Sequence, residues 1–419
     1  MARRPAVPDV LRERDYRLLF GAQATSLLGD QMATVALAFG VLGIGGSASD
    51  VGLVFAARSL ALMASLLGGG VIGDRLPRRR VLAATDLVRL ASQGLLAAVL
   101  IGGGTAIWPV VALSAVTGAA TGVFNPTATA FLPAVVAPRR LQEANALRSL
   151  AASAGRIAGP LLAGVLVATA GAGWALAVDA ATYAVSAVLV LGIRVAGAPA
   201  GVGPAERATV LADLRAGWTA FRSRRWLWAI VAWAAVGNVV LGAWRVLGPV
   251  VAEHDLGGVT AWSAIIAASG AGGVAGGLVA LRAAPRRPLL LAVGALALFY
   301  PQMALLAAVA PTAVIAVAAA VGEAGLILCL TVWESTLQRH VEPRLLSRVS
   351  AYDWLGSLAF EPLGLAVWGP IAAVVGVSEA LWLATGLGVL SIVAVLAVRD
   401  VRTLPAAPAA AAVAGATDG

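Results

Sequence analysis

Twelve long apolar stretches, separated by short polar connections, make up most of this sequence. A helix that crosses a bilayer needs about 20 apolar residues in succession, and because its backbone polar groups must be satisfied internally, each stretch is predicted to be a helix. The stretches lie near residues 18–43, 51–73, 80–103, 107–130, 144–169, 173–194, 226–250, 259–281, 288–309, 312–335, 346–374 and 377–398. The sequence therefore predicts an all-α integral membrane protein with twelve transmembrane helices.

The composition excludes a soluble globular protein. Only 12% of the 419 residues are charged and the mean hydropathy is +0.89, whereas soluble proteins carry about 25% charged residues. One large soluble core is also excluded, because cores stop growing near about 250–300 residues. Most of the chain must face lipid or other helices.

The arginines orient the predicted bundle. All 30 basic residues are Arg. Most of those outside the predicted spans lie in the two tails and in the even-numbered connections, whereas the odd-numbered connections contain no Arg. By the positive-inside rule, both termini and the even connections are cytoplasmic. We therefore expect a multi-pass protein of the inner (plasma) membrane, and we interpret the net charge of +9 as a topology signal rather than as a nucleic-acid site.

The sequence lacks the residues that several kinds of nucleotide-binding, metal-binding and catalytic site require. Without Lys the chain cannot form a P-loop, and His254, His340 and Cys329 cannot supply a zinc site or a disulfide within the chain. There is no Ser–His pair, metal cluster or Gly-x-Ser-x-Gly elbow in the sequence. The sequence therefore predicts no cofactor, no metal and no enzymatic activity.

The two halves of the chain share a plan. A shift of 208 residues superposes Gly29-Asp30 on Gly237-Asn238, and a shift of 205 superposes Gly159 on Gly364. The predicted parts are a cytoplasmic tail, a six-helix bundle, a central linker, a second six-helix bundle and a disordered cytoplasmic tail, at residues 1–17, 18–194, 195–225, 226–399 and 400–419. Within the linker, Asp213 to Arg222 can form an amphipathic helix or remain solvated. Two such pseudo-symmetric bundles are the plan of major facilitator transporters.

The connection after the second stretch reads Gly70-Val71-Ile72-Gly73-Asp74-Arg75-Leu76-Pro77-Arg78-Arg79-Arg80. This segment resembles the loop signature of the major facilitator superfamily, with Pro77 in place of the family's second Gly. Asp74 can cap the third helix. The resemblance implies that the motif latches the two halves at the cytoplasmic gate through Gly70, Asp74, Arg75, Arg79 and Arg80. Alternatively, the Arg run only enforces topology.

A second motif lies in the fifth stretch and reads Gly155-Arg156-Ile157-Ala158-Gly159-Pro160-Leu161-Leu162-Ala163-Gly164. Gly155, Gly159, Pro160 and Gly164 resemble the antiporter-type signature of the exporter branches of the superfamily. Small residues four apart also allow close helix packing, and Pro160 loosens a helix locally. The resemblance implies export, and ordinary helix packing is the alternative interpretation.

The opening of the chain resembles the drug:proton antiporter branch that includes macrolide-type efflux proteins and the enterobactin exporter. The similarity is carried by Arg14-Asp15-Tyr16-Arg17-Leu18-Leu19-Phe20 and Ser26-Leu27-Leu28-Gly29-Asp30. One departure concerns the fourth span, where Ser114 replaces an Arg that the family associates with proton coupling. Coupling would therefore use other residues.

Ionisable side chains inside the spans are the candidate site residues, because they are expensive in a bilayer. Asp30 lies near the middle of the first span, where an isolated carboxylate could exchange protons or bind substrate; a structural hydrogen bond is the alternative. Glu323, in the tenth span, is the second candidate. Arg156 and Glu361 occupy equivalent positions in the two halves and are further candidates.

Other charges suggest ion pairs. Asp86 and Arg89 are three residues apart and can pair on one helix face. Arg148 and Asp353 occupy matched positions, which suggests either ionic contacts that break during transport or fixed contacts. We interpret three further charges as snorkelling or as sealing the outer side: Arg58, Asp179 and Arg245.

The sequence is thus interpreted as a monomeric secondary transporter whose partners are a small-molecule substrate, protons and the lipid bilayer. The resemblance implies export of amphipathic, drug-like compounds by proton antiport with alternating access. The alternatives are export of a siderophore, lipid or other endogenous metabolite, and a membrane scaffold or receptor without transport activity.

Overall fold

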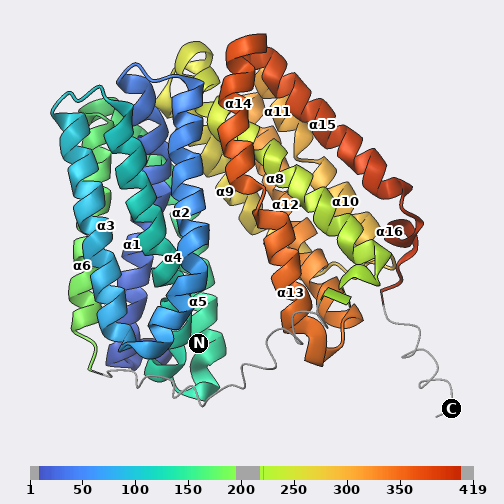
Figure 1. Ribbon diagram of the computed structural model, residues 1–419, viewed down its shortest axis with the longest axis horizontal. Coiled ribbons are helices and arrows are strands. Elements are labelled where there is room, and N and C mark those ends of the chain that lie inside the picture. The colour runs from blue at the N-terminus through green and yellow to red at the C-terminus, as the bar shows by residue number, and fades with distance from the viewer. Residues whose placement is uncertain (1–8, 195–217, 220, 407–419) are drawn as a thin grey trace, which may run out of the picture. The chain divides into compact units, whose positions relative to one another are not determined.

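The computed structural model describes residues 9–194, 218–219 and 221–406, except for the side chains of residues 67, 69–71, 73–75, 343, 344, 347, 348 and 351. Within these residues the regular structure is entirely helical. Twelve segments are long and apolar enough to cross a membrane, which confirms the predicted number of spans (Figure 1). Most of the predicted linker helix at 213–222 and of the C-terminal tail lies outside the described residues.

The first six spans are single helices. They are α1 (Arg14–Gly43), α2 (Ala48–Arg75), α3 (Arg78–Ile101), α4 (Ile107–Val135), α5 (Leu141–Ala170) and α6 (Ala172–Leu191), with short 3-10 turns at Asp9–Arg12 and Pro138–Arg140. A capping box begins α2, since the Asp50 carboxylate accepts the Ser47 backbone N–H at 2.8 Å and the Ser47 hydroxyl accepts the Asp50 N–H at 3.3 Å. Apolar side chains including Tyr16, Leu19 and Phe131 form a buried core here.

The second half is divided into a larger number of helices, some of them long and some short. They are α8 (Arg225–Val251), α9 (Val259–Ala280), α10 (Pro288–Ala297), α11 (Tyr300–Ala307), α12 (Thr312–His340), α13 (Pro343–Leu358), α14 (Glu361–Val375), α15 (Val377–Ala397) and α16 (Arg399–Thr403), with a π-helical turn at Ala252–Leu256. A separate buried core in this half includes Leu227, Leu289 and Val349.

Two spans that the sequence predicts as continuous are broken in the structure. The ninth span divides into α10 and α11, and α13 and α14 follow each other through the eleventh. A proline ring removes one hydrogen bond and clashes with the carbonyl four residues earlier. α10 ends at Ala297, four residues before Pro301, and α13 ends at Leu358, four residues before Pro362. Each break is therefore attributed to the following proline.

The internal repeat also appears as matching turns. Gly171 is the sole residue between α5 and α6, and Gly376, which is 205 residues later, is the sole residue between α14 and α15. Their φ angles are +96° and +101°, and their ψ angles are 160° and 154°. Residues with a side chain rarely adopt this conformation. Glycine is therefore required at the same junction in both halves.

The chain divides into two compact units. One consists of Met1–Gly203 with Ala252–Ala267, and the other consists of Pro204–Val251 with Ala268–Gly419. Helix α9 thus contributes residues to both units. The network and the cavity described next belong entirely to the first unit.

Candidate functional site

Asp30 of α1 lies at the junction of three other helices. Its Oδ1 accepts hydrogen bonds from Nη2 of Arg58 on α2 at 3.1 Å and from the hydroxyl of Tyr183 on α6 at 2.7 Å. Its Oδ2 lies 3.9 Å from Nη1 of Arg89 on α3. Asp30 therefore joins four helices through one carboxylate, and its side chain retains 23% exposure.

Arg89 occupies the centre of this network and is almost fully buried. It forms an ion pair with Asp86, one turn earlier on α3, and the Ser186 hydroxyl of α6 donates to the other oxygen of Asp86 at 2.7 Å. The Arg89 guanidinium also lies over the rings of Phe124 and Tyr183, at 4.0 and 4.4 Å from their centroids. Carboxylates and aromatic faces together stabilise a desolvated guanidinium.

Asp179 of α6 is the third carboxylate of the network and is fully buried. Gln93 of α3 donates to its Oδ2 at 2.8 Å, and Thr182 lies beside Oδ1 at 3.4 Å. Among the described residues of the first unit, no Arg side chain lies within 4.0 Å of this carboxylate; Arg58 and Arg89 act on it from farther away. Asp179 is thus held by neutral donors.

The formal charges of this network do not balance. It contains three carboxylates and two guanidinium groups, so one negative charge remains uncompensated when all five groups are ionised: Asp30, Asp86, Asp179, Arg58 and Arg89. An uncompensated charge inside a membrane protein is expensive. One bound proton would make the network neutral.

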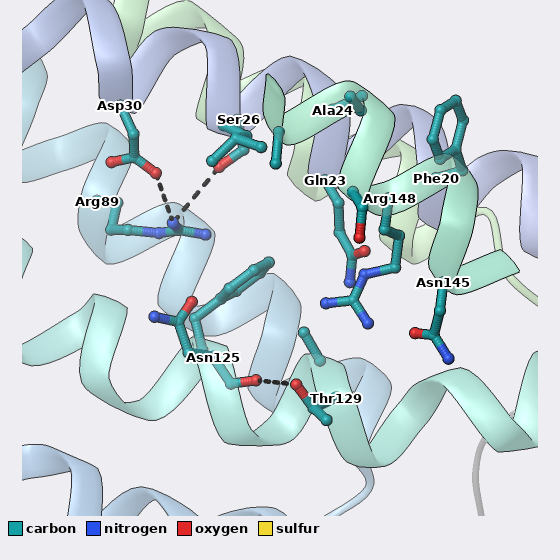
Figure 2. Close-up of a pocket in the computed structure, with 16 residues that line it drawn as sticks. Phe20, Gln23, Ala24, Ser26, Asp30, Arg89, Asn125, Thr129, Asn145 and Arg148 are labelled. Atoms are coloured by element: carbon teal, nitrogen blue, oxygen red, sulfur yellow. Dashed lines mark hydrogen bonds and ion pairs between the residues drawn. The ribbon is translucent and has the colours of Figure 1, made fainter. Parts of the chain in front are cut away.

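The network opens onto a cavity of about 470 Å³ between α1, α3, α4 and α5. Figure 2 shows Asp30, Arg89 and Ser26 at one end, joined by the contacts from Arg89 to Asp30 and to Ser26. The volume lies within the range of small-molecule sites, about 300–1,000 Å³. Of the three carboxylates in the network, Asp30 is the one that lines this cavity.

The other end of the cavity is lined by a different set of polar side chains. Gln23 of α1 and Arg148 of α5 lie close together there, with Asn145 nearby (Figure 2). Both amide atoms of Gln23 are buried without a hydrogen-bond partner, and no carboxylate among the described residues of this unit lies within 4.0 Å of Arg148. Apolar walls complete the cavity, from Phe20, Leu27, Phe124, Ala24, Ala128, Ala151 and Ala152. The lining therefore suits a molecule with an apolar body and polar groups.

The structure corrects three sequence interpretations. Asp30 is not an isolated carboxylate, because Arg58, Arg89 and Tyr183 contact it. Arg58 does not snorkel, since its guanidinium group pairs with Asp30 inside the bundle. Asp179 does not snorkel either, because it is buried at the α3–α6 contact. Asp86 and Arg89 do form an ion pair within α3.

Several residues of the network carry no charge and were missed by sequence reasoning. Their helical spacing is the signal that could have found them, because polar residues three, four and seven apart share a helix face. On α3 and α6 these polar faces consist of Asp86, Arg89 and Gln93, and of Asp179, Tyr183 and Ser186. Both faces are apolar elsewhere, so such a polar row indicates a functional contact.

The predicted residues of the second unit have separate partners. Glu361 of α14 forms an ion pair with Arg245 of α8, and Asp353 accepts the indole N–H of Trp333 at 3.1 Å. Glu323 of α12 lies 3.5 Å from the Ser269 hydroxyl of α9. A contact of Arg148 with Asp353 stays a prediction. In the first unit, Nε of Arg156 is buried without a hydrogen-bond partner.

The loop motif is described only in part. At Gly70, Asp74 and Arg75 the structure describes the backbone only. Arg79 donates to the backbone carbonyl of Ile193, after α6, at 2.7 Å, and Arg80 is exposed. Arg79 therefore fixes the start of α3 against the end of α6 within the first unit.

The helix-five motif allows close packing. A Cβ atom on Gly159 would lie 2.6 Å from Cβ of Gln31 on α1, and one on Gly164 would lie 2.6 Å from Oγ of Ser263, in the same unit. Gly155 is less constrained, with Leu27 at 3.8 Å. Pro160 lies inside an unbroken α5. The glycines of this motif thus bring α5 against its neighbours.

Replacing Gly159 with Ala is expected to destabilise the protein by about 1–3 kcal/mol, because the added methyl group overpacks the α1–α5 contact. The measurement is the fraction of monodisperse protein that remains after heating in detergent. Gly94→Ala on α3 is the matched control, since its methyl group would meet no atom within 4 Å. Equal stability of the two variants would contradict the packing argument.

Comparisons with known proteins identify the family. The profile of the Major Facilitator Superfamily matches residues 19–357. An uncharacterized MFS-type transporter of Bacillus subtilis (strain 168), YvqJ, is 24% identical over 255 residues, which is 60% of this chain and 60% of that protein. The aligned part therefore covers less than two thirds of that relative.

Solved structures show the same fold. The nucleoside transporter NupG has a TM-score of 0.72 at 14% identity and covers 92% of this chain and 98% of its own. The peptide transporter POT in complex with sulfate has a TM-score of 0.73 at 14% identity, over 94% and 96%. A bacterial homologue of the iron transporter ferroportin has a TM-score of 0.69 at 15% identity, over 91% and 98%.

The twelve spans and the match to the profile of this transporter family define the protein as a secondary active membrane transporter and not an enzyme. More specifically, the chain belongs to the Major Facilitator Superfamily.

Proposed function

We propose that this transporter exports amphipathic small molecules from the cytoplasm in exchange for protons. The observation that carries the proposal is the buried network of three carboxylates and two guanidinium groups, which reaches a cavity at Asp30. A network with one excess negative charge binds one proton to become neutral. The transporter thus has a group that can couple proton movement to the contents of its cavity.

The cavity favours an amphipathic cargo. Phe20, Leu27 and Phe124 supply apolar surface, while Asn125 and Arg148 supply hydrogen-bond donors. A cargo that brings positive charge or hydrogen-bond donors close to Asp30 would compete with the proton, as antiport requires. Drug-like compounds, siderophores, lipids and other endogenous metabolites include molecules of this kind. A scaffold or receptor would not need a network poised to bind a proton.

Direction and orientation come from the sequence. The motif from Gly155 to Gly164 resembles that of the exporter branches, and its packing is compatible with that role. The Arg distribution supports cytoplasmic termini in the inner (plasma) membrane. In this proposal the protein acts as a monomer, and the loop motif with Asp74 and Arg75 is part of the cytoplasmic gate.

The transport experiment uses inside-out vesicles energised to an acidic interior. Ethidium, the macrolide erythromycin and the catecholate siderophore enterobactin are the probes. We expect vesicles containing the transporter to accumulate at least one probe, and an uncoupler to abolish the accumulation. A protease added outside should remove a tag at either terminus, because both tails would face outward. Accumulation that survives the uncoupler would contradict proton antiport, and no accumulation of any probe would contradict export of this cargo class.

A further inference from the structure

We propose that Asp179 holds the coupling proton of this transporter, on Oδ1, while Asp30 and Asp86 stay ionised. This inference deepens the proposed function and depends on it for the link to transport. It assigns the proton within the network to one buried side chain. The assignment follows from the partners of each carboxylate.

Two of the carboxylates have the partners of ionised groups. Asp86 forms an ion pair with Arg89 and accepts the Ser186 hydroxyl at 2.7 Å. Asp30 accepts from Arg58 at 3.1 Å and from Tyr183 at 2.7 Å. Charged and hydroxyl donors of this kind stabilise the ionised form of a carboxyl group. Each of these two acids therefore has its negative charge compensated by a guanidinium group.

Asp179 has the partners of a neutral acid. The amide of Gln93 donates to Oδ2 at 2.8 Å, and the side chain is fully buried. An ionised carboxylate that is fully buried has a large desolvation free energy unless a guanidinium or ammonium group pairs with it. Since the network needs one proton for neutrality, the carboxyl group without an ion pair is the one that binds it.

The hydroxyl of Thr182 supplies an independent argument. Its Oγ1 lies 2.7 Å from the backbone carbonyl oxygen of Asp179 and 3.4 Å from Oδ1 of the same residue. A hydroxyl has one hydrogen, and here it serves the shorter contact with the carbonyl. At 3.4 Å the same hydroxyl gives Oδ1 at most a weak hydrogen bond, so Oδ1 lacks the close donor that an ionised carboxylate needs. The geometry around Oδ1 thus matches a protonated carboxyl group.

Charged groups on α1, α2 and α3 influence how readily Asp179 binds its proton. Asp30 acts on Asp179 from α1, Arg58 acts from α2 and Arg89 acts from α3, while Tyr183 is one turn along α6. From α5, which also packs on α6, no charged side chain among the described residues lies within 4.0 Å of Asp179. Cargo that binds beside Asp30 therefore changes the electrostatic environment of Asp179 through Arg58 and Arg89.

The proposed exchange moves one proton. With the cavity empty, a proton from the outer side occupies Asp179 and the network is neutral. When cargo contributes positive charge at Asp30, the network becomes neutral without the proton, which leaves Asp179 for the cytoplasm. Asp179 is a buried store for the proton in this cycle, and Asp30 is the residue that faces the cavity.

Infrared spectroscopy of the reconstituted transporter tests the assignment without any cargo. We expect wild-type protein at neutral pH to show the carbonyl stretch of a protonated carboxyl group. Asp179→Asn should lose the intensity of one such group, whereas Asp255→Asn, an exposed acid outside the network, should not. Thr182→Val keeps Asp179 but removes the hydroxyl beside its Oδ1, so the band should shift. A spectrum that is unchanged in both Asp179→Asn and Thr182→Val would overturn the assignment.

Transport of ethidium separates this inference from the proposed function. If wild-type vesicles show no uncoupler-sensitive accumulation of any of the three probes, the proposed function fails, while the infrared result still decides where the proton lies. If wild-type vesicles accumulate ethidium, Asp179→Asn should lose the uncoupler-sensitive part and keep ethidium exchange across vesicles without a gradient. Full proton-driven accumulation by Asp179→Asn would overturn the role of Asp179.

Discussion

Replacing Asp30 with Asn is expected to abolish proton-driven accumulation in inside-out vesicles while leaving the transporter folded. Asn keeps the size of the side chain and an oxygen that can accept the Tyr183 hydroxyl. The substitution removes one of three carboxylates, so the remaining two balance Arg58 and Arg89 without a proton. The network then has no need to bind a proton, and accumulation should fall to that of vesicles without the transporter.

Two further variants make the Asp30 prediction specific. Asp30→Glu keeps the negative charge and should retain a measurable part of the uncoupler-sensitive accumulation. Asp255→Asn, which changes an exposed acid, should retain all of it. Wild-type accumulation by Asp30→Asn at equal protein level would show that the proton is coupled elsewhere.

The fold could be predicted because apolar length and Arg distribution act on whole segments. Twelve runs long enough for a bilayer determine twelve helices whatever their detailed packing. The breaks after Ala297 and Leu358 were readable too, because Pro301 and Pro362 each lie four residues later. The sequence interpretation treated those spans as uniform apolar runs and so missed a local steric effect.

The site was harder to predict from the sequence, because the depth of each residue along its helix and the rotation of that helix decide which charged side chains come into contact. Asp30 and the pair of Asp86 and Arg89 stood out as charges in apolar spans. Arg58 and Asp179 lie roughly 15 and 10 Å into α2 and α6 at a rise of about 1.5 Å per residue, and such a depth does not by itself distinguish a snorkelling charge from a buried one. Which helix faces meet is a tertiary property, so the contact of Gln93 with Asp179 could not be read from either helix alone.

Replacing Arg89 with Gln is expected to have the largest effect on stability of any substitution in the network. Asp86 is fully buried, and the change removes its ion-pair partner while leaving its negative charge. Breaking a buried pair from one side costs about 3–5 kcal/mol. We expect little monodisperse protein after extraction in detergent, and a lower temperature of unfolding for what remains. Wild-type stability of Arg89→Gln would contradict the central role of this pair.

The double variant Arg89→Gln with Asp86→Asn distinguishes loss of the pair from loss of the proton site. Both partners become neutral amides that can still hydrogen bond, so most of the lost stability should return. The network then contains Asp30, Asp179 and Arg58, which again leaves one negative charge in excess. Proton-driven accumulation should therefore return together with stability, whereas Asp86→Asn alone removes the excess charge and should lose it. A double variant that is stable but uncoupled would mean that Arg89 itself, rather than the charge balance, carries the coupling.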